Sequence, residues 1–345
     1  MNLQKIAKTA GVSKATVSRV LNKSKKVSPA TRQKVLDTIE RLGVNPRTRG
    51  QKGKKSKNIL ILICGRDLFM EYSPARWRIL YGVQKVLSKK NANLMTYQLI
   101  NNEDLPRHLL NNIDGIIVMG KIKTDSKPLQ TISDIPSVWI NSMGSANNDM
   151  ALARNQLVGQ MAAQYLISRG HKHLAFYRVV LNHPAIKMDG DFFEFTAIKS
   201  GCTVSTVEGI QDFPDEDNID TWLMLEQVTE KAMKQLVRVR PRPTGLFIPL
   251  GKAIEMSYKY LKKENVRPGC DIEIIGCGCE KAMLASLCPH PANISINVET
   301  IGEKAAEQLL YKIEKPDDIS PVNITVIPTL TRCSEINNLL VSGGM

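Results

Sequence analysis

The sequence GVSKATVSRVLN, residues 11–22, predicts a tight turn followed by a short capped helix. Gly11 supplies the turn, because glycine adopts positive φ without steric cost, and Ser13 is a residue type that caps helices. Apolar side chains at Val17, Val20 and Leu21 have the spacing of an inward face. The outward face is mostly polar and cationic; it carries Lys14, Ala15, Ser18, Arg19 and Asn22. Such a face indicates a surface that binds a partner.

One further helix is expected on each side of this stretch. The first ends at Gly11, and the third begins at Ser28, has Pro29 in its first turn and ends at Gly43. Both have apolar residues at helical spacing, namely Ile6, Ala7 and Ala10 in the first and Val35, Ile39 and Leu42 in the third. Two short helices around a glycine turn, with a supporting third helix, form a helix-turn-helix.

The positive charge of the chain is confined to its first part. The net charge is +14 over 345 residues, and residues 1–57 alone hold 16 Lys and Arg against two acids. The rest holds 31 basic and 31 acidic side chains and is neutral. A basic module joined to a neutral body is typical of polyanion binding, because each neutralised phosphate releases counterions.

The second helix therefore has the residues to read double-stranded DNA. In a helix-turn-helix this helix enters the major groove with its N-terminal residues at the base edges. Lys14 and Arg19 can donate to guanine O6 and N7, and the methyl group of Ala15 fits a thymine methyl. Short polar side chains suit phosphate oxygens; these are Ser13, Thr16, Ser18, Asn22 and Thr31. The alternative is a three-helix bundle with a solvated basic face.

This first part resembles the DNA-binding head of the LacI/GalR family of bacterial transcriptional repressors. The resemblance rests on the motifs AGVS, TVSRVLN, VSPATRQKV and the closing NP. It implies a homodimer on a pseudo-palindromic operator. It also implies that Lys14 and Ala15 stand at positions that vary with operator sequence, and Arg19 at a near-constant position that contacts guanine.

Residues 47–57 depart from the family pattern. In the family a helix begins near Pro46 and inserts a leucine into the minor groove. Here Gly50 stands at the usual alanine position and Gly53 at the usual leucine position, and glycine disfavours a helix. The stretch is therefore predicted to be a flexible basic linker, with Arg47 and Arg49 on phosphates or in a narrow minor groove.

From residue 58 the chain alternates apolar strands with amphipathic helices. Strands are expected in two series, first NILILIC, NLMTYQLI, IDGIIVMG and IPSVWIN, then HLAFYRVV, TGLFIPL and DIEIIGC. Repeated strand–helix units predict parallel, doubly wound sheets. The predicted fold class is therefore α/β, with an N-terminal helix-turn-helix head and two doubly wound parallel-sheet lobes.

The body also resembles the family, in its periplasmic-binding-protein-like effector domain. The matching segments are SPARWRILYGV, SRGHKHLAF, RPGCDIEIIG and ISINVETIGEKAAEQLL. The resemblance implies that the chain crosses between lobes near residues 156, 292 and 321. The expected domains are 1–46 for the head, 47–57 for the linker, 58–156 and 292–320 for the N-terminal lobe, 157–291 and 321–334 for the C-terminal lobe, and 335–345 for a tail.

Such a fold places a small-molecule effector in the cleft at the carboxyl ends of the strands, between the lobes. Sugar-binding family members usually have an arginine, an Asn-Asp pair and an aspartate at positions that are here Lys187, residues 249–250 and the GCGCE stretch at 276–280. The acidic groups that hold sugar hydroxyls are thus largely absent. Candidate ligand residues at strand ends are Arg66, Asp67, Arg76, Trp77, Asn141, Arg178, Lys187, Glu280, Asn297 and Glu299. Their basic excess favours an anionic or phosphorylated member of the expected sugar-related class, and a surface or supporting role is the alternative for each.

Other kinds of function lack a signal. The seven scattered cysteines favour reduced thiols, and no signal core or long apolar window is present, so a cytoplasmic protein is expected. Neither a metal nor a cofactor is expected, because Cys277 and Cys279 lack a nearby histidine pair and no phosphate loop, nucleophile elbow or GxGxxG motif occurs. An enzyme is therefore not expected. A solute-binding receptor would share the body but not the basic head.

These observations predict a homodimeric regulator, a repressor by its resemblance, whose operator affinity a small molecule controls. The alternative within the family is a regulator that has lost its effector and binds DNA constitutively.

Overall fold

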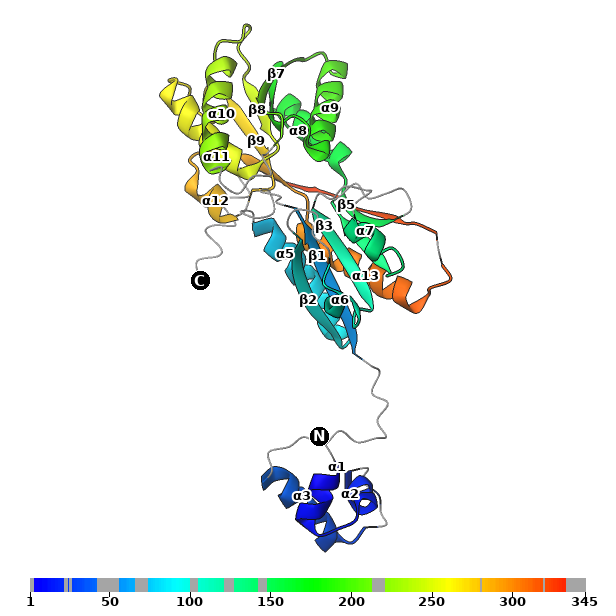
Figure 1. Cartoon of the computed structure of the whole chain (residues 1–345). Helices are drawn as coiled ribbons and strands as arrows, with labels where there is room; N and C mark the ends of the chain where they lie inside the picture. Colours follow the sequence, from blue (N-terminus) through cyan, green and yellow to red (C-terminus); the bar gives the residue numbers. More distant parts are fainter. Residues whose placement is uncertain are drawn as a thin grey trace. The chain divides into compact units, whose positions relative to one another are not determined.

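The computed structural model describes residues 3–21, 24, 27–41, 56–65, 74–99, 105–120, 127–141, 148–212, 221–279, 281–318 and 320–332. The chain divides into two compact units, Met1–Ser56 and Lys57–Met345. The first unit is the helical head and the second is the α/β body (Figure 1).

Three helices form the head, as the sequence predicts: α1 (Leu3–Ala10), α2 (Lys14–Leu21) and α3 (Pro29–Arg41). Their small core contains Ile6, Val17, Val20 and Val35, each no more than 3% exposed. Gly11 has a φ of +63° in the turn between α1 and α2, a conformation that glycine adopts readily. The head therefore buries the predicted inward residues Val17 and Val20 and orients α2 by packing on both other helices.

The first lobe of the body is built on a parallel six-stranded sheet in the order β11-β5-β4-β3-β1-β2. Its strands are β1 (Lys57–Cys64), β2 (Ala92–Leu99), β3 (Gly115–Gly120), β4 (Ser137–Ile140), β5 (Asp149–Ala153) and β11 (Asn323–Val326). Its helices are α5 (Pro74–Lys89), α6 (Arg107–Leu110), α7 (Lys127–Thr131) and α13 (Val298–Glu314). Apolar side chains of α5 and α13 cover one face of this sheet, and a second cluster fills the other face.

The second lobe has another six-stranded sheet, in the order β12-β10-β9-β8-β6-β7, with β12 antiparallel to β10 and the other pairs parallel. Its strands are β6 (His173–Val180), β7 (Thr203–Ile210), β8 (Gly245–Ile248), β9 (Glu273–Cys277), β10 (Ala292–Ser295) and β12 (Thr329–Thr331). Its helices are α8 (Asn155–Ser168), α9 (Pro184–Lys199), α10 (Thr221–Leu236), α11 (Gly251–Lys263) and α12 (Lys281–Ser286).

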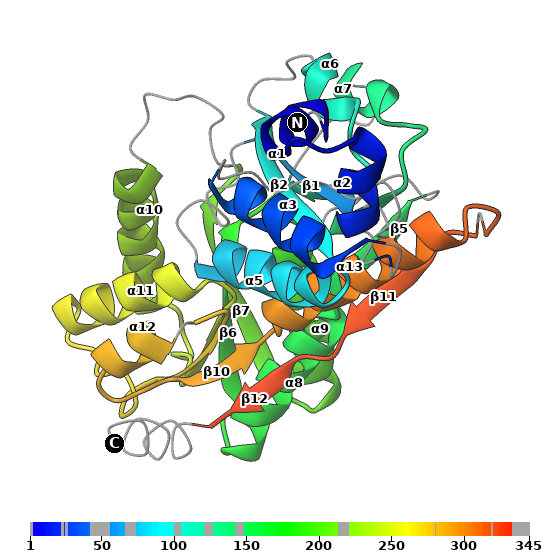
Figure 2. The same cartoon turned by 90° about the horizontal axis from the view of Figure 1, so that it is seen from below.

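Helices cover both faces of the second sheet, which makes it doubly wound. Neighbouring residues of a strand point to opposite faces. Phe176 of β6 packs on Phe193 of α9, with ring centroids 6.1 Å apart, whereas the hydroxyl of Tyr177 bonds Thr229 of α10 at 3.0 Å. Accordingly, α8 and α9 lie on one side of the lobe and α10 and α11 on the other (Figures 1 and 2).

Three segments, here called the crossover segments, join the lobes: residue 154, residues 296–297 and residues 327–328. The strands place two of them differently from the sequence prediction. Strand β10 belongs to the second sheet although residues 292–320 were expected in the first lobe, and β11 belongs to the first sheet although residues 321–334 were expected in the second. Both are four-residue strands at or next to a sheet edge, and only their pairing partners, β9 and β5, decide the sheet to which they belong.

Candidate nucleic-acid interface and ligand residues

The polar face of α2 is open to solvent. Lys14, Ala15 and Arg19 are exposed, and Thr16 and Ser18 are half-buried, while Val17 beneath them is completely buried. The residues predicted to read base edges therefore lie on one accessible helix face. Asn22, Arg47 and Arg49, which were also predicted to contact DNA, lie outside the described residues.

Serine caps fix the start of α2 and of α3. The amide N–H of Thr16 donates to Oγ of Ser13 at 3.0 Å, and the amide N–H of Thr31 donates to Oγ of Ser28 at 3.3 Å. The hydroxyl groups of each pair are also hydrogen-bonded, at 2.9 and 2.8 Å. Such caps hold helix N-termini in the orientation in which their amide groups favour phosphate. Ser13, Thr16 and Thr31 thus have a capping role beside their predicted phosphate contact.

Two predicted ligand residues bond backbone near the crossover segments. Asn141 follows β4 with a φ of +45°, and its Oδ1 accepts the N–H of Ala153 at 3.0 Å. Asn297 has a φ of +53°, and its Nδ2 donates to the carbonyl oxygen of Ile327 at 2.9 Å. The bond from Asn297 ties the second crossover segment to the third.

Three other predicted ligand residues lie on the helices α5 and α13. Glu299, in the first turn of α13, forms an ion pair with Lys85 of α5 at 3.2 Å. Trp77 is 70% exposed on α5, and Arg76 beside it is half-buried. Glu299 therefore joins two helices of the same lobe in this structure.

The segment from β6 to α9 holds the two remaining described candidates. Arg178 lies on β6, and its Nε is buried without a hydrogen-bond partner among the described residues. Lys187 is exposed in the first turn of α9. No hydrogen bond or ion pair joins any two of the described candidates. Arg66, Asp67 and Glu280 lie outside the described residues.

A buried carboxyl group that no sequence pattern indicates contacts the residue that follows the first crossover segment. Asp189 of α9 is 3% exposed, and its Oδ1 accepts a hydrogen bond of 3.0 Å from Nδ2 of Asn155, the first residue of α8. Burial raises the pKa of Asp189 from 3.8 to about 7, and the bond from Asn155 opposes that rise. An aspartate on a helix gives no sequence signal of burial.

The substitution Asp189→Asn is expected to stabilise the protein at pH 8 and to change it little at pH 4. Because the folded state holds the proton more tightly than the unfolded chain, the wild type loses stability as the pH rises from about 4 to about 7. Asparagine can still accept the hydrogen bond from Asn155, and it does not ionise. The free energy of unfolding at pH 8 should therefore be higher in the variant than in the wild type, by at most about 4 kcal/mol. Urea unfolding of both proteins at the two pH values measures it, and an equal difference at both would contradict the raised pKa.

The thiols and acidic groups of the described chain show no metal site. The six cysteines of the described residues are outside disulfide bonds, and burial raises the pKa of Cys64 to about 12, which keeps that thiol protonated. Among the described residues, no group of three or more His, Cys, Asp or Glu side chains is arranged to hold a metal ion. No described helix is long and apolar enough to span a membrane.

Sequence comparison assigns both parts of the chain to known domain types. Residues 2–47 match the profile of bacterial regulatory proteins of the lacI family, and residues 163–333 match the periplasmic binding protein-like domain. Catabolite control protein A of Priestia megaterium is 30% identical over 286 residues, which cover 79% of this chain and 80% of that protein. The HTH-type transcriptional repressor PurR of Histophilus somni (strain 129Pt) is 30% identical over 294 residues, with coverages of 79% and 81%.

Solved structures share the fold. The lac repressor dimer bound to operator and the anti-inducer ONPF superposes with a TM-score of 0.72 at 17% identity, over 96% of this chain and 98% of that chain. The complex of the transcriptional regulator CelR with cellobiose gives 0.66 at 21% identity, with the same coverages. These relatives are regulators and not enzymes. The chain therefore belongs to the LacI family of bacterial DNA-binding transcriptional regulators.

Proposed function

We propose that this regulator is a cytoplasmic repressor that binds a pseudo-palindromic operator as a homodimer and responds to a small molecule between its lobes. The observation that supports DNA binding is the exposed face of α2, with Lys14 and Arg19 on it, in a chain whose whole net charge lies in residues 1–57. In this proposal Arg19 and Lys14 donate to guanine, and the serine-capped N-termini of α2 and α3 approach phosphates.

Operator binding by the full-length protein is expected to weaken steeply as salt rises. If the two heads make about 6–10 phosphate contacts, affinity falls roughly 10³- to 10⁵-fold between 50 and 200 mM salt. Fluorescence anisotropy with a duplex found by genomic footprinting measures the slope, and a scrambled duplex is the control. An affinity that does not change with salt concentration would show that the basic side chains of the head do not contact DNA phosphates.

The homodimer is proposed to form through the outer face of α5. Trp77 and Tyr81 are 70% and 60% exposed and stand one helical turn apart, so they form a shared aromatic surface. Exposed aromatic patches of this kind mark protein interfaces. A second copy is the occupant we propose, since the lac repressor, which shares this fold, binds its operator as a dimer. In this proposal Trp77 lies in the subunit interface and does not make the effector contact that the sequence predicts.

The double substitution Trp77→Ala and Tyr81→Ala is expected to shift the protein toward monomer and to weaken operator binding at least about tenfold, because the two heads are no longer linked. Sedimentation velocity gives the oligomeric state. The matched control is Phe195→Ala, which removes an aromatic ring that is 60% exposed on α9. A dimer that persists in the double variant would place the interface elsewhere.

The effector is proposed to be an anionic, sugar-related molecule at the carboxyl ends of the strands. Two cationic side chains on the segment from β6 to α9 are the argument for an anionic ligand. Lys187 is exposed, and Arg178 has a buried Nε that lacks a hydrogen-bond partner among the described residues. A ligand oxygen would satisfy this nitrogen, because a buried donor without a partner costs free energy.

A thermal-shift screen of sugars, sugar phosphates and sugar acids tests the effector. A compound that binds is expected to raise the Tm, to change operator affinity and to lose both effects in Lys187→Ala. Because coupling between two sites is reciprocal, operator DNA must change the affinity for the compound by the same factor. If no compound shifts the Tm or the operator affinity, the regulator is the constitutive binder that the sequence leaves as the alternative.

A further inference from the structure

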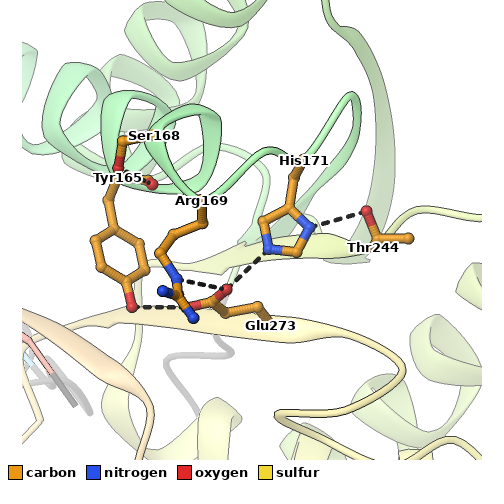
Figure 3. Close-up of polar contacts among 6 residues, drawn as sticks. All are labelled: Tyr165, Ser168, Arg169, His171, Thr244 and Glu273. Carbon is orange, nitrogen blue, oxygen red and sulfur yellow. Dashed lines mark hydrogen bonds and ion pairs between the residues drawn. The ribbon is translucent and has the colours of Figure 1, made fainter. Parts of the chain in front are cut away.

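A cluster of polar side chains surrounds Glu273 at the start of β9. Its carboxylate accepts hydrogen bonds from the Tyr165 hydroxyl at 2.6 Å, from Nε of Arg169 at 3.1 Å and from Nε2 of His171 at 2.8 Å (Figure 3). Burial acts to raise the pKa of Glu273, but the bonds from these three partners outweigh it and hold the pKa below its ordinary value. Glu273 is therefore ionised, and its acceptor capacity is used within the protein.

A cavity of about 710 Å³ opens beside this cluster. Its walls come from the last turns of α8, the starts of β9 and β10, the preceding turn at residues 289–291, and β12. Small-molecule sites have volumes of about 300–1,000 Å³. The cavity therefore has the size of a metabolite site.

The cavity lies at the opposite end of the second sheet from the proposed effector site. Strands β9 and β10 are parallel, and their amino-terminal residues Glu273 and Ala292 line the cavity, whereas their carboxyl ends lead toward α12 and the second crossover segment. Strand β12 is antiparallel to β10, so its carboxyl end brings Leu330 and Arg332 to the same place. A ligand here would be separate from one at the carboxyl ends of the strands.

The charges of the walls favour an anion. Arg169 and Arg332 are the cationic side chains of the described lining, and Glu273 is its one carboxylate. The Glu273 carboxylate already binds three side chains. One of them is Arg169, which donates from Nε and whose side chain is 60% exposed. The guanidinium group suits carboxylates because it donates in a planar fork.

The remaining wall combines the polar side chains of Gln164, Ser168, Tyr258 and His290 with apolar surface. Nδ1 of His290 donates to the carbonyl oxygen of Leu284 at 2.6 Å, which leaves the hydrogen of the neutral ring on Nδ1 and makes Nε2 an acceptor. Met161, Ile274 and Leu330 add apolar contacts. A ligand that matches these walls carries an acidic group on an apolar body.

We propose that this cavity is a second ligand site, which binds a small organic acid as its anion, with Arg169 and Arg332 as the groups that hold the carboxylate. The anionic fluorophore 8-anilinonaphthalene-1-sulfonate is a suitable probe, because it joins an acidic group to an apolar body. Its titration into the full-length regulator is expected to give a saturable fluorescence increase that benzoate reverses and that the neutral isostere benzamide does not.

Variants locate the site. Arg332→Ala is expected to weaken probe binding about tenfold, because one charge-assisted hydrogen bond is lost. Gln164→Trp, which fills the cavity from an exposed position on α8, should abolish it, and Glu273→Gln should strengthen it by removing the opposing charge. Arg238→Ala, at an exposed arginine after α10, is the control and should bind the probe as the wild type does.

Two results would overturn the proposal: fluorescence that is unchanged in both Arg332→Ala and Gln164→Trp, or displacement by benzamide as efficient as displacement by benzoate. The measurement involves no DNA. Arg19→Ala, which should lose the operator, is expected to bind the probe unchanged, so failure of this site and failure of the proposed repressor function remain distinguishable.

Discussion

Replacing Arg19 by alanine is expected to remove specific operator binding and to leave only weak binding to any duplex. The side chain is exposed on α2, directly beside the buried Val20 that fixes its helix in the head. A bidentate arginine–guanine contact contributes about 1–3 kcal/mol of discrimination. A dimer uses the residue twice, so the ratio of specific to nonspecific affinity should fall roughly 30-fold to 3 × 10⁴-fold.

Competition binding between operator and scrambled duplexes measures that ratio. Lys8→Ala is the matched control in the head, since it removes an exposed positive charge from α1 rather than from the reading helix. It should weaken binding to both duplexes by the same factor and reduce the salt dependence slightly. An unchanged footprint for Arg19→Ala would contradict the proposed readout.

Replacing Gly82 by alanine is expected to destabilise the body by about 3 kcal/mol. A Cβ at this position would lie 2.1 Å from the carbonyl oxygen of Glu299, and one at Gly302 would lie 2.3 Å from the carbonyl oxygen of Ile79. The helices α5 and α13 thus meet backbone to backbone at two glycines. The higher helix propensity of alanine would stabilise the helix by about 1 kcal/mol. The added methyl group would, however, collide with backbone atoms of α13, which cannot move aside as a flexible side chain can.

Urea unfolding of the wild type and Gly82→Ala measures this difference. Gln84→Ala, on an exposed position of the same helix, is the control and should lie within about 0.5 kcal/mol of the wild type. A Gly82→Ala protein as stable as the wild type would mean that the two helices separate without cost.

The head could be predicted from sequence because its signals are local. The turn at Gly11, the caps at Ser13 and Ser28 and the inward Val17 and Val20 each depend on residues within a few positions. The alternating strands and helices of the body were also predictable, since long apolar strands such as β1 are recognised from their own residues.

The predicted ligand residues show what local patterns leave undecided. Asparagine at a strand end suits a ligand contact and a left-handed turn equally, and at Asn141 and Asn297 the structure shows the turn. The partners of the Glu273 carboxylate are more than 100 positions away along the chain. Such a cluster depends on packing of α8 against the second sheet, and no spacing in the sequence encodes it.

The positions of β11 and β12 bear on how the protein is made. Each sheet receives one of its outermost strands from residues 323–331, β11 beside β5 and β12 beside β10. During synthesis, therefore, neither lobe can be completed until almost the whole described chain has left the ribosome. For the same reason, a gene fragment that ends before residue 323 would encode a first sheet without its outermost strand β11 and a second sheet without its outermost strand β12. A separately expressed lobe would need this last strand to be fused to the rest of its sheet through an engineered connection.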